Sequence, residues 1–333
     1  MHMADALLSP MVGGALWAAS AGSVAYAAAR IQKDGFSEKK LPVMAVAGAF
    51  IFAAQMINFT IPGTGSSGHI GGGLLLSGLL GGGPALLTLS AVLVIQCLFF
   101  ADGGLLALGA NIFNIGILPC LVAYPLVFRP LLRKGITKQR LSIASVLSVV
   151  LGLQLGAFGV VIETLASGVT ELPFRTFMLL MQPIHLAIGL VEGIVTAAIL
   201  CFVWQMRPEL VESTQKRAPV PAGAAMRRIV AVLAVSALLL GGGLSWFASS
   251  NPDGLEWSME HTAGTTELER SDPVHTAATE IQHRLSFLPD YDFASGNGSG
   301  TAAAGITGAI LTCALAAGIG GAVTLYKRKK TGK

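Results

Sequence analysis

The first two residues of the chain carry the groups best suited to binding a metal ion. His2 directly follows Met1. The α-amine, the amide nitrogen of His2 and the Nδ1 atom of His2 can bind one ion together, because they close a five-membered and a six-membered chelate ring. Three nitrogens then lie in one plane with a fourth corner open, and a planar all-nitrogen set suits Ni²⁺ or Cu²⁺ best. Since a bulky second residue hinders removal of Met1, we expect Met1 to be retained.

A second histidine stands in a glycine-rich stretch, residues 61–73, with the sequence IPGTGSSGHIGGG. Its glycines and proline allow the tight turns that let a loop enter a helix bundle. Irregular backbone at membrane depth is tolerated only inside protein. His69 can therefore supply the fourth nitrogen. A phosphate-binding loop is excluded because no Lys-Ser or Lys-Thr pair follows the glycines. The alternative is a structural turn in which His69 is incidental.

A few polar residues lie within or beside apolar stretches. His185 and Glu192 are seven residues apart and share one face of a helix, and ionisable groups inside a membrane are candidates for function. We favour the alternative that they bond to amide side chains such as Asn111 and lock the bundle. Asp5, one turn from His2, is expected to orient the metal site or to balance its charge.

Membrane helices must position these residues. Hydrophobic residues make up 53% of the chain and charged residues only 12%, whereas soluble domains carry about a quarter charged residues. Apolar stretches of roughly 20 residues cross a ~30 Å hydrocarbon core as helices, because backbone groups have no water to bond in lipid. We therefore predict an all-α polytopic membrane helix bundle. Its clearest spans are residues 43–61, 74–100, 105–127, 141–162, 187–206, 229–248 and 305–326.

The charged loops predict the topology. Lys and Arg mark cytoplasmic loops, and they gather around residues 30–40, 129–140, 207–228 and 327–330. Residues 249–304 carry nine acidic residues against two arginines and belong outside. Alternating sides then require about nine transmembrane helices, seven plus two, with the N-terminus outside and the C-terminus inside. The helix at residues 71–80 is expected to be short, and the first basic residue, Arg30, lies too late for a cleavable signal peptide.

Composition also divides the chain into parts. We predict a seven-helix metal-binding membrane domain at residues 1–206 and a proline-containing cytoplasmic linker at residues 207–228. A two-helix accessory domain with a large external loop follows at residues 229–333. In that loop, His261, His275 and His283 are expected to be solvated, with weak metal gathering as the alternative.

Small residues recur every fourth position on the first helix, at Gly14, Ala18 and Gly22. Small residues at this spacing let helices approach closely in lipid. We expect this face to pack within the chain, and the alternative is that it docks a partner membrane subunit.

Four motifs resemble those of the CbiM/NikM family, the substrate-binding membrane components of energy-coupling-factor importers for cobalt and nickel. They are MHMADALLSP at residues 1–10, PGTGSSGH at 62–69, FADGGLLALGAN at 100–111 and HLAIGLVE at 185–192. Two further motifs, PDGLE at residues 252–256 and LPDYDF at 288–293, resemble the PDGLE domain, a small N component fused C-terminally. Residues 3–6 depart from the His-Ile-Pro-Asp-Gly pattern common in the family.

The resemblance implies that Met1, His2 and His69 bind the ion. Asp5, Asn111, His185 and Glu192 then form a second shell or a structural polar network. It also implies a transmembrane coupling protein and cytoplasmic ATPase subunits as partners. The chain has no Walker A sequence, so ATP hydrolysis is expected in those separate subunits and the chain is not expected to be an enzyme. Neither a resident cofactor nor nucleic acid is expected.

We therefore predict a component that captures Ni²⁺ at the outer face of a prokaryotic inner (plasma) membrane for ATP-driven uptake. The planar nitrogen set and the PDGLE resemblance favour nickel, and Co²⁺ uptake for corrinoid synthesis is the alternative. A membrane metalloenzyme would need an open coordination position and a nearby base, and the sequence has no HExxH motif. A purely structural scaffold would hold no metal.

Overall fold

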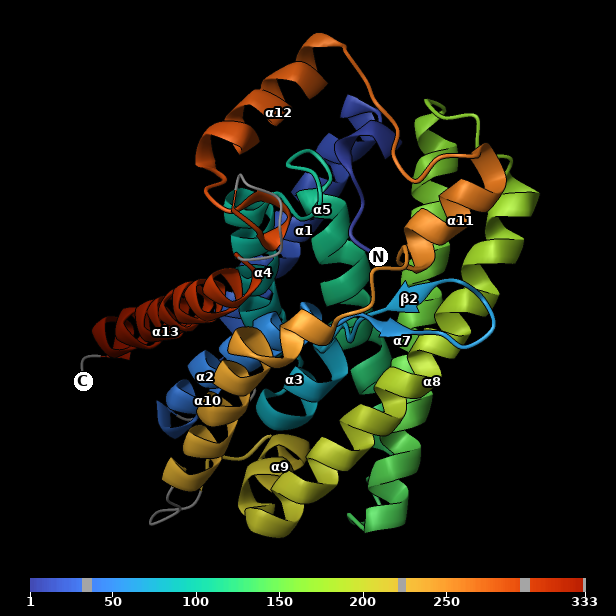
Figure 1. Cartoon of the computed structure of the whole chain (residues 1–333). Helices are drawn as coiled ribbons and strands as arrows, with labels where there is room; N and C mark the ends of the chain where they lie inside the picture. Colours follow the sequence, from blue (N-terminus) through green and yellow to red (C-terminus); the bar gives the residue numbers. More distant parts are fainter. Residues whose placement is uncertain (32–37, 221–225, 294–299, 332–333) are drawn as a thin grey trace.

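The computed structural model describes residues 1–31, 38–220, 226–293 and 300–331, with side chains up to residue 326. Within these ranges the chain is mostly helical and has one short antiparallel hairpin, β1 (Phe59–Thr60) with β2 (Ser67–Gly68) (Figure 1). The helices are η1 (Asp5–Leu7), α1 (Pro10–Arg30), η2 (Glu38–Lys40), α2 (Leu41–Gln55), α3 (Gly73–Leu80), α4 (Gly82–Phe100), α5 (Leu108–Asn111), the π-helix η3 (Ile112–Phe128), α6 (Arg129–Leu131), α7 (Lys138–Ser167), α8 (Phe174–Met206), α9 (Pro208–Lys216), α10 (Arg227–Gly242), η4 (Leu244–Phe247), α11 (Gly254–Ala263), α12 (Pro273–Leu285), η5 (Pro289–Tyr291) and α13 (Thr301–Thr331).

Six helical stretches in the described part of the chain are long and apolar enough to cross a membrane. They are α1, α4, the continuous stretch Leu108–Leu131, α7, α8 and α13 as far as Tyr326. Helices α2 and α10 have 15 and 16 residues, and α3 has eight, as short as the sequence suggested. The predicted all-α membrane bundle is confirmed in this coarser form, while nine crossings and their orientation stay predictions.

Helices α3, η3 and α7 pack closely because glycines face a proline. Pro119 lies inside η3, where it provides no backbone N–H for a helical hydrogen bond. A Cβ at Gly73 of α3 would lie 2.8 Å from Pro119 Cγ, and one at Gly152 of α7 would lie 3.1 Å from Pro119 Cβ. The absence of side chains at these two glycines lets three helix backbones meet around the proline.

The two C-terminal helices belong to the bundle. Both α10 and α13 pack against α2, and they also pack against each other. At the crossing of α10 and α13, a Cβ at Gly241 would lie 3.0 Å from the backbone of Gly305. Similarly, a Cβ at Gly48 of α2 would lie 3.3 Å from Thr312 Cγ2 of α13. The segment predicted as an accessory domain therefore lies directly on the membrane bundle.

The predicted linker begins with a helix. Pro208–Lys216 forms α9, which buries Leu210 and Val211 and packs against α3 and α8. The Lys40 ammonium also donates a hydrogen bond to Thr214 Oγ1 of α9. The first part of the predicted linker is thus helical, because the apolar side chains of α9 find a surface to bury against. Residues 221–225 of the predicted linker lie outside the described part.

The small-residue face of α1 points away from the rest of the chain. A Cβ at Gly14 or Gly22 would have no atom within 4 Å, and Ala18 is exposed. The expectation that this face packs within the chain is wrong, because the opposite face of α1 is the one in contact. There, the hydroxyl of Ser20 donates a hydrogen bond of 2.6 Å to the carbonyl of Gly109.

The predicted external loop folds over one end of the bundle. Helix α12 lies there above the N-terminal segment and helix α11 lies beside it (Figure 1). Each is begun by an aspartate N-cap, Asp272 and Asp253 respectively. His275 is buried, with Nε2 3.0 Å from the carbonyl oxygens of Asp5 and Leu8. It is therefore not solvated, because α12 closes over η1.

The environment of His275 favours its charged form. Burial works to lower the pKa of His275, but Asp272, whose carboxylate lies 2.6 Å from Nδ1, and the two carbonyls raise it overall. The other two histidines of this region, His261 and His283, are exposed as expected.

Candidate metal site

The N-terminal segment before α1 extends into the interior of the helix bundle. Asn111 clamps Met3 from both sides, since its Oδ1 accepts from Met3 N at 2.7 Å and its Nδ2 donates to Met3 O at 3.2 Å. Gly104 N also donates to Met3 O, at 2.9 Å. Asp5 was expected to orient the metal site beside His2, but its Oδ1 accepts a hydrogen bond from Ala107 N at 2.9 Å. The loop after α4 and the start of α5 thus hold residues 3–5 in place.

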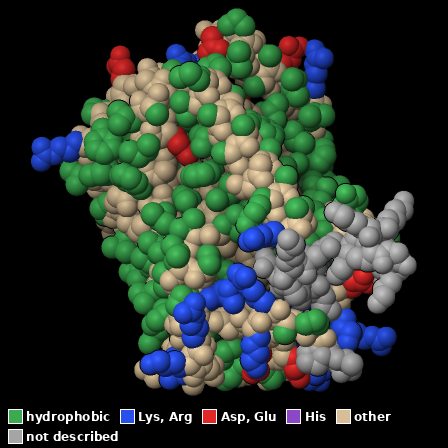
Figure 2. All heavy atoms as spheres, turned by 180° about the vertical axis from the view of Figure 1, so that it is seen from behind, with side chains coloured by type: hydrophobic (Ala, Val, Ile, Leu, Met, Phe, Trp, Pro, Cys, Tyr) green, Lys and Arg blue, Asp and Glu red, His purple; other side chains and the backbone are tan. Residues whose placement is uncertain are grey.

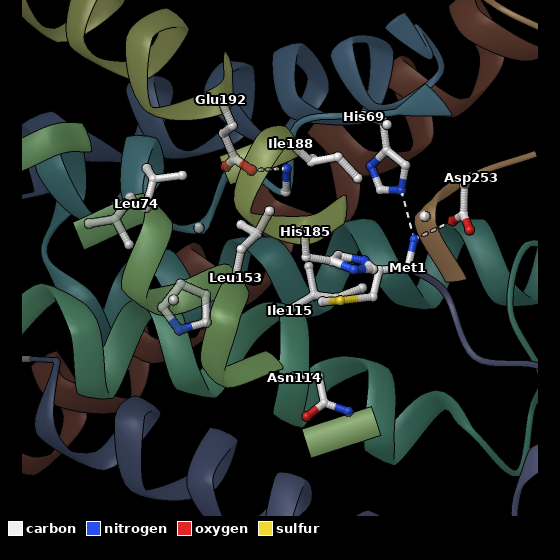
Figure 3. A pocket seen from close by; sticks show the side chains of 17 residues that line it. Met1, His69, Leu74, Asn114, Ile115, Leu153, His185, Ile188, Glu192 and Asp253 are labelled. Atoms are coloured by element: carbon white, nitrogen blue, oxygen red, sulfur yellow. Dashed lines mark hydrogen bonds and ion pairs between the residues drawn. The ribbon is translucent and has the colours of Figure 1, made fainter. Parts of the chain in front are cut away.

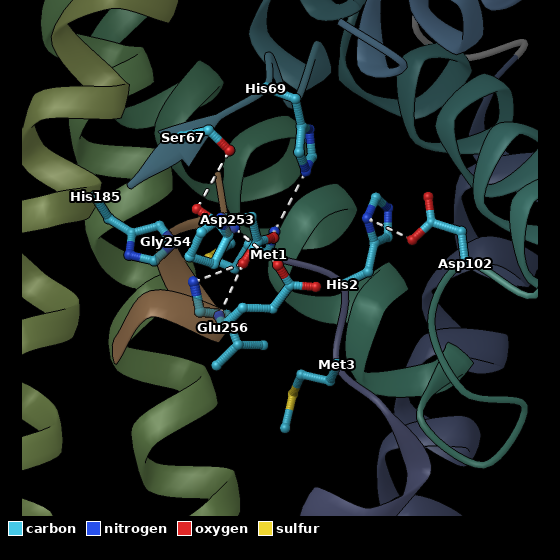
Figure 4. A network of polar contacts seen from close by, with 12 residues as sticks. Met1, His2, Met3, Ser67, His69, Asp102, His185, Asp253, Gly254 and Glu256 are labelled. Atoms are coloured by element: carbon cyan, nitrogen blue, oxygen red, sulfur yellow. Dashed lines mark hydrogen bonds and ion pairs between the residues drawn. The ribbon is translucent and has the colours of Figure 1, made fainter. Parts of the chain in front are cut away.

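The α-amine and the two predicted histidines lie close together at the end of this N-terminal segment (Figure 4). Met1 N lies 3.3 Å from His69 Nε2. The rings of His2 and His69 stack with centroids 5.2 Å apart and an interplanar angle of 12°. The structure therefore brings together the three residues that the sequence selected, Met1, His2 and His69.

The glycine-rich loop holds His69 with one nitrogen ready to accept. His69 Nδ1 lies 3.2 Å from the Ile70 carbonyl, a contact in which the ring must donate. Nε2, which faces Met1, therefore carries the lone pair. The β1–β2 hairpin turns through Gly63 and Gly65, whose φ angles of 76° and 75° favour glycine. This turn brings His69 back into the bundle.

Glu192 fixes the chain just after His69. Its two carboxylate oxygens accept hydrogen bonds from Gly71 N and Gly72 N, each at 2.9 Å. The predicted bond to amide side chains is replaced by one to the loop backbone. Glu192 of α8 thus holds the backbone two and three residues after His69.

His185 lines a small cavity of about 30 Å³ beneath Met1 (Figure 3). Its Nδ1 lies 2.8 Å from the Met181 carbonyl, and its Nε2 has no hydrogen-bond partner among the described residues. Asn114 and Glu163 bind each other at 2.7 Å on the η3 and α7 side. His185 and Glu192 therefore do not form a common network with Asn111.

Two carboxylates at the site were missed by sequence reasoning. Asp253, the N-cap of α11, forms an ion pair with the Met1 ammonium. Asp102, in the loop after α4, has Oδ1 3.2 Å from His2 Nδ1. Asp102 stands inside the family-like motif at residues 100–111, and Asp253 inside PDGLE, so motif membership was the only available signal.

Burial and charge keep both histidines neutral. Burial, and after it the Met1 ammonium, lowers the pKa of His69. Burial also lowers the pKa of His2, against the opposing effect of Asp102. Burial works to raise the pKa of Asp253, but the Met1 ammonium holds it well below its usual range. Neutral imidazoles are the form that binds metals.

A large cavity leads to the site from the end covered by α11 and α12. Its volume is about 1030 Å³, and its lining includes His2 and His69 together with seven acidic side chains and one arginine, Arg270. The acidic side chains are Asp5, Asp102, Asp253, Glu256, Glu267, Glu269 and Asp290. A cleft lined mainly by one sign of charge raises the local concentration of the opposite ion. This cavity, here called the acidic vestibule, therefore favours the approach of a cation to the two histidines.

In the described structure, His2 Nδ1 contacts Asp102 and the Met1 ammonium is paired with Asp253. A metal ion held by both nitrogens would therefore require the His2 ring to turn and the amine to lose a proton. No group of three or more His, Cys, Asp or Glu side chains in the described ranges is arranged to hold a metal.

Comparison with known families places the chain. Residues 2–210 match CbiM, described as "Cobalt uptake substrate-specific transmembrane region". The chain belongs to the CbiM family. Residues 227–325 match the PDGLE domain, which contains Asp253. Both resemblances noted in the sequence are thereby confirmed, and this CbiM chain is a multi-pass membrane protein.

Relatives of this CbiM chain are metal transporters. It is 33% identical to the "Putative fused nickel transport protein NikMN" of Archaeoglobus fulgidus, over 98% of the chain and 99% of the relative. It is 30% identical to the "Cobalt transport protein CbiM" of Sorangium cellulosum, over 65% and 96%. A crystal structure of a transition metal transporter matches with a TM-score of 0.55 at 29% identity, over 64% of this chain and 96% of that one.

Proposed function

We propose that this chain is the metal-binding component of an energy-coupling-factor importer and captures Ni²⁺ at the outer face of a prokaryotic plasma membrane. The Met1 α-amine, the His2 amide, His2 Nδ1 and His69 Nε2 would form a square-planar set around the ion, which is the transported substrate. The proposal takes Met1 as the mature N-terminus. It ascribes no catalysis to the chain.

One observation carries this proposal. A free α-amine lies 3.3 Å from the lone-pair nitrogen of a buried neutral histidine, and the ring of a second-position histidine stacks beside it. An N-terminus is normally a solvated, mobile group. Burying this group is costly, and the ion pair with Asp253 offsets part of that cost in the metal-free chain. The α-amine is thereby held beside the two imidazoles.

Nickel is favoured over cobalt by geometry. A planar four-nitrogen field suits Ni²⁺, whereas Co²⁺ gains less from that geometry. The fused nickel transport protein of Archaeoglobus fulgidus covers both parts of the chain, which agrees with nickel as substrate. The cobalt relatives match over a smaller share of it. Co²⁺ uptake remains the second candidate.

Competition between the two ions tests the metal directly. The purified chain, offered equal Ni²⁺ and Co²⁺, should retain about one Ni²⁺ per chain, with at least a tenfold preference following the stability order of divalent ions. Elemental analysis after desalting measures both ions. Preferential retention of Co²⁺ would move the proposal to cobalt, and retention of neither would remove metal binding altogether.

We propose nine membrane crossings, with residues 1–206 as the metal-binding domain and residues 229–333 as the accessory domain. Helices α2, α3 and α10 would be the short crossings, buried or half-covered by neighbours. The acidic vestibule and α11 and α12 then lie outside. The basic clusters lie inside, where the positive-inside rule puts them.

Labelling of single cysteines tests this orientation. With the four native cysteines replaced, cysteines at the exposed Ser250 and at Thr331 should react with an impermeant maleimide only from outside and only from inside, respectively. Intact and permeabilised cells provide the comparison. Labelling of both positions from the same side would rule out nine crossings.

The partners we propose are a transmembrane coupling protein and cytoplasmic ATPase subunits. The outward small-residue face of α1 supports the first, because helices dock closely through such faces. ATP hydrolysis would lie in the separate subunits, since the chain has no Walker A sequence.

A further inference from the structure

A cavity of about 220 Å³ lies at the end of the bundle far from the metal site, around the start of α4. Three basic residues line it: Arg30 at the end of α1, Lys40 before α2 and Arg217 after α9. The metal site lies beyond the other end of α4, near Asp102. The cavity is thus separate from the candidate metal site.

Lys40 is the most unusual group in this cavity. Its side chain is almost fully buried, at 2% exposed. Its ammonium donates to Thr214 Oγ1, and no carboxylate pairs with it within the described ranges. A buried ammonium normally requires an anionic partner. Burial lowers the pKa of Lys40 to about 8, as expected for a charge without such compensation.

The start of α4 faces the same cavity. Gly81 is the N-cap and offers no side chain to the first amides, so the N–H groups of Gly82 and Gly83 have no side-chain acceptor. A Cβ at Gly83 would meet nothing nearer than the Ala27 carbonyl at 3.7 Å, whereas one at Gly82 would clash with the Cys120 carbonyl, so the turn is more open at Gly83. The N-terminus of a 19-residue helix favours negative charge.

Exposed side chains of α1 line one side of this cavity. Tyr26 of α1 lines it and is 53% exposed, with the Arg30 guanidinium 5.0 Å from the centre of its ring. Tyrosines gather at the membrane interface. Figure 2 shows Lys and Arg side chains gathered toward the lower end of the rear face, below a broad hydrophobic surface. Basic pockets between transmembrane helices bind anionic lipid headgroups.

We propose that this cavity binds a phosphate group, carried by an anionic phospholipid such as phosphatidylglycerol. The headgroup phosphate would accept from the Gly82 and Gly83 amides and neutralise Lys40 and Arg30, while the acyl chains extend into the surrounding bilayer. A lipid bound here would join α1, α4, η3 and α9, since each contributes to the lining. Inorganic phosphate offers the same chemistry without the acyl chains.

Native mass spectrometry of the full chain in detergent tests this site. Titration with phosphatidylglycerol should show one lipid retained in preference to phosphatidylcholine. The Arg30→Gln, Lys40→Met double variant should weaken this binding about 30-fold, because each basic residue near the headgroup contributes about a factor of five. Lys216→Gln provides a matched control, since Lys216 is basic and on α9 but pairs with Glu212 outside the cavity.

Further arms keep the result interpretable. Arg30 is exposed, so Arg30→Gln alone should fold and lose about fivefold in lipid affinity. Ni²⁺ binding should be unchanged in every variant, which checks folding and keeps this test apart from that of the metal site. Equal retention of both lipids, or equal loss in the Lys216→Gln control, would overturn the proposal. Displacement of the lipid by an equal concentration of inorganic phosphate would identify the free anion as the occupant and overturn the lipid assignment.

Discussion

Replacing His69 with alanine should weaken Ni²⁺ binding by more than about 100-fold. Loss of even an outer-shell partner of a metal ligand costs 10–100-fold, and His69 is proposed as a ligand itself. Its Nε2 is the only side-chain nitrogen in hydrogen-bond contact with the Met1 amine among the described residues, so water would take the vacant corner. Equilibrium dialysis with Ni²⁺ measures the change.

The exposed histidine of α11 provides the control for this experiment. His261→Ala removes an exposed imidazole that contacts Trp257, with ring centroids 4.3 Å apart, and lies outside the site. It should leave Ni²⁺ affinity within a factor of about two, as surface substitutions usually do little. Equal weakening by His261→Ala and His69→Ala would show that the assay reports surface binding, and an unaffected His69→Ala would remove His69 from the ligand set.

An inserted leucine sharpens the same test. Placing Leu between Met1 and His2 creates an amine, two amides and one imidazole nitrogen, which fill four planar corners without His69. In this background, His69→Ala should have little further effect. A fully additive effect of the Leu insertion and His69→Ala would argue against a shared coordination sphere.

The Ni²⁺ affinity of the native chain should fall as the pH is lowered, because the amine and the amide must lose protons to bind the ion.

Replacing Asp253 with asparagine should reduce the stability of the metal-free chain much more than it reduces Ni²⁺ affinity. The ion pair between Asp253 and the Met1 ammonium is 10–15% exposed, and breaking a buried pair costs on the order of 3 kcal/mol. Metal binding replaces the ammonium by a complex of the same net charge, Ni²⁺ with one amidate. Asp253 then faces one positive charge in either state, and affinity should change by about tenfold or less.

Two variants separate the charge of Asp253 from its role as helix cap. Asp253 Oδ1 accepts from Leu255 N and Glu256 N, a cap that asparagine can maintain. Asp253→Ala should therefore cost about 1 kcal/mol more than Asp253→Asn. Glu256→Gln, which retains an acceptor for Asp253 N, is the control for a nearby lost charge. Thermal unfolding with and without Ni²⁺ measures all three, and an Asp253→Asn chain as stable as the native one would show that the ion pair contributes nothing.

The sequence was sufficient to predict the long helices. An apolar stretch such as residues 141–162 must be helical in lipid whatever its neighbours are. In the structure this stretch lies within α7. The short helices α9, α11 and α12 lie in polar stretches. Their formation depends on the surface that each one covers, so composition alone predicted only a linker and a loop. The capping pattern Asp253 to Glu256 marks the start of α11 but not its position over the metal site.

The candidate site was predicted in part for the same reason. Because successive transmembrane helices end on alternate sides of the membrane, the sequence predicted Met1, His2 and His69 on the same side. The geometry of the chelate rings then made these three residues a candidate set of metal ligands. The partners of these groups are set by tertiary contacts. Asp253 meets Met1 across 252 positions of sequence, and Asp102 rather than Asp5 faces His2. Periodicity and spacing carry no information about such distant pairs.

Whether the free α-amine is a metal ligand is the most direct test of the account. The chain can be made with an N-terminal extension whose proteolytic removal leaves Met1 first, as the intact mass confirms. Ni²⁺ content and the visible absorption of the bound ion are then measured before and after cleavage on the same preparation. We predict about one Ni²⁺ per chain with a planar-nitrogen spectrum after cleavage, and no such ion before it. The same affinity and spectrum before and after cleavage would contradict the proposed site.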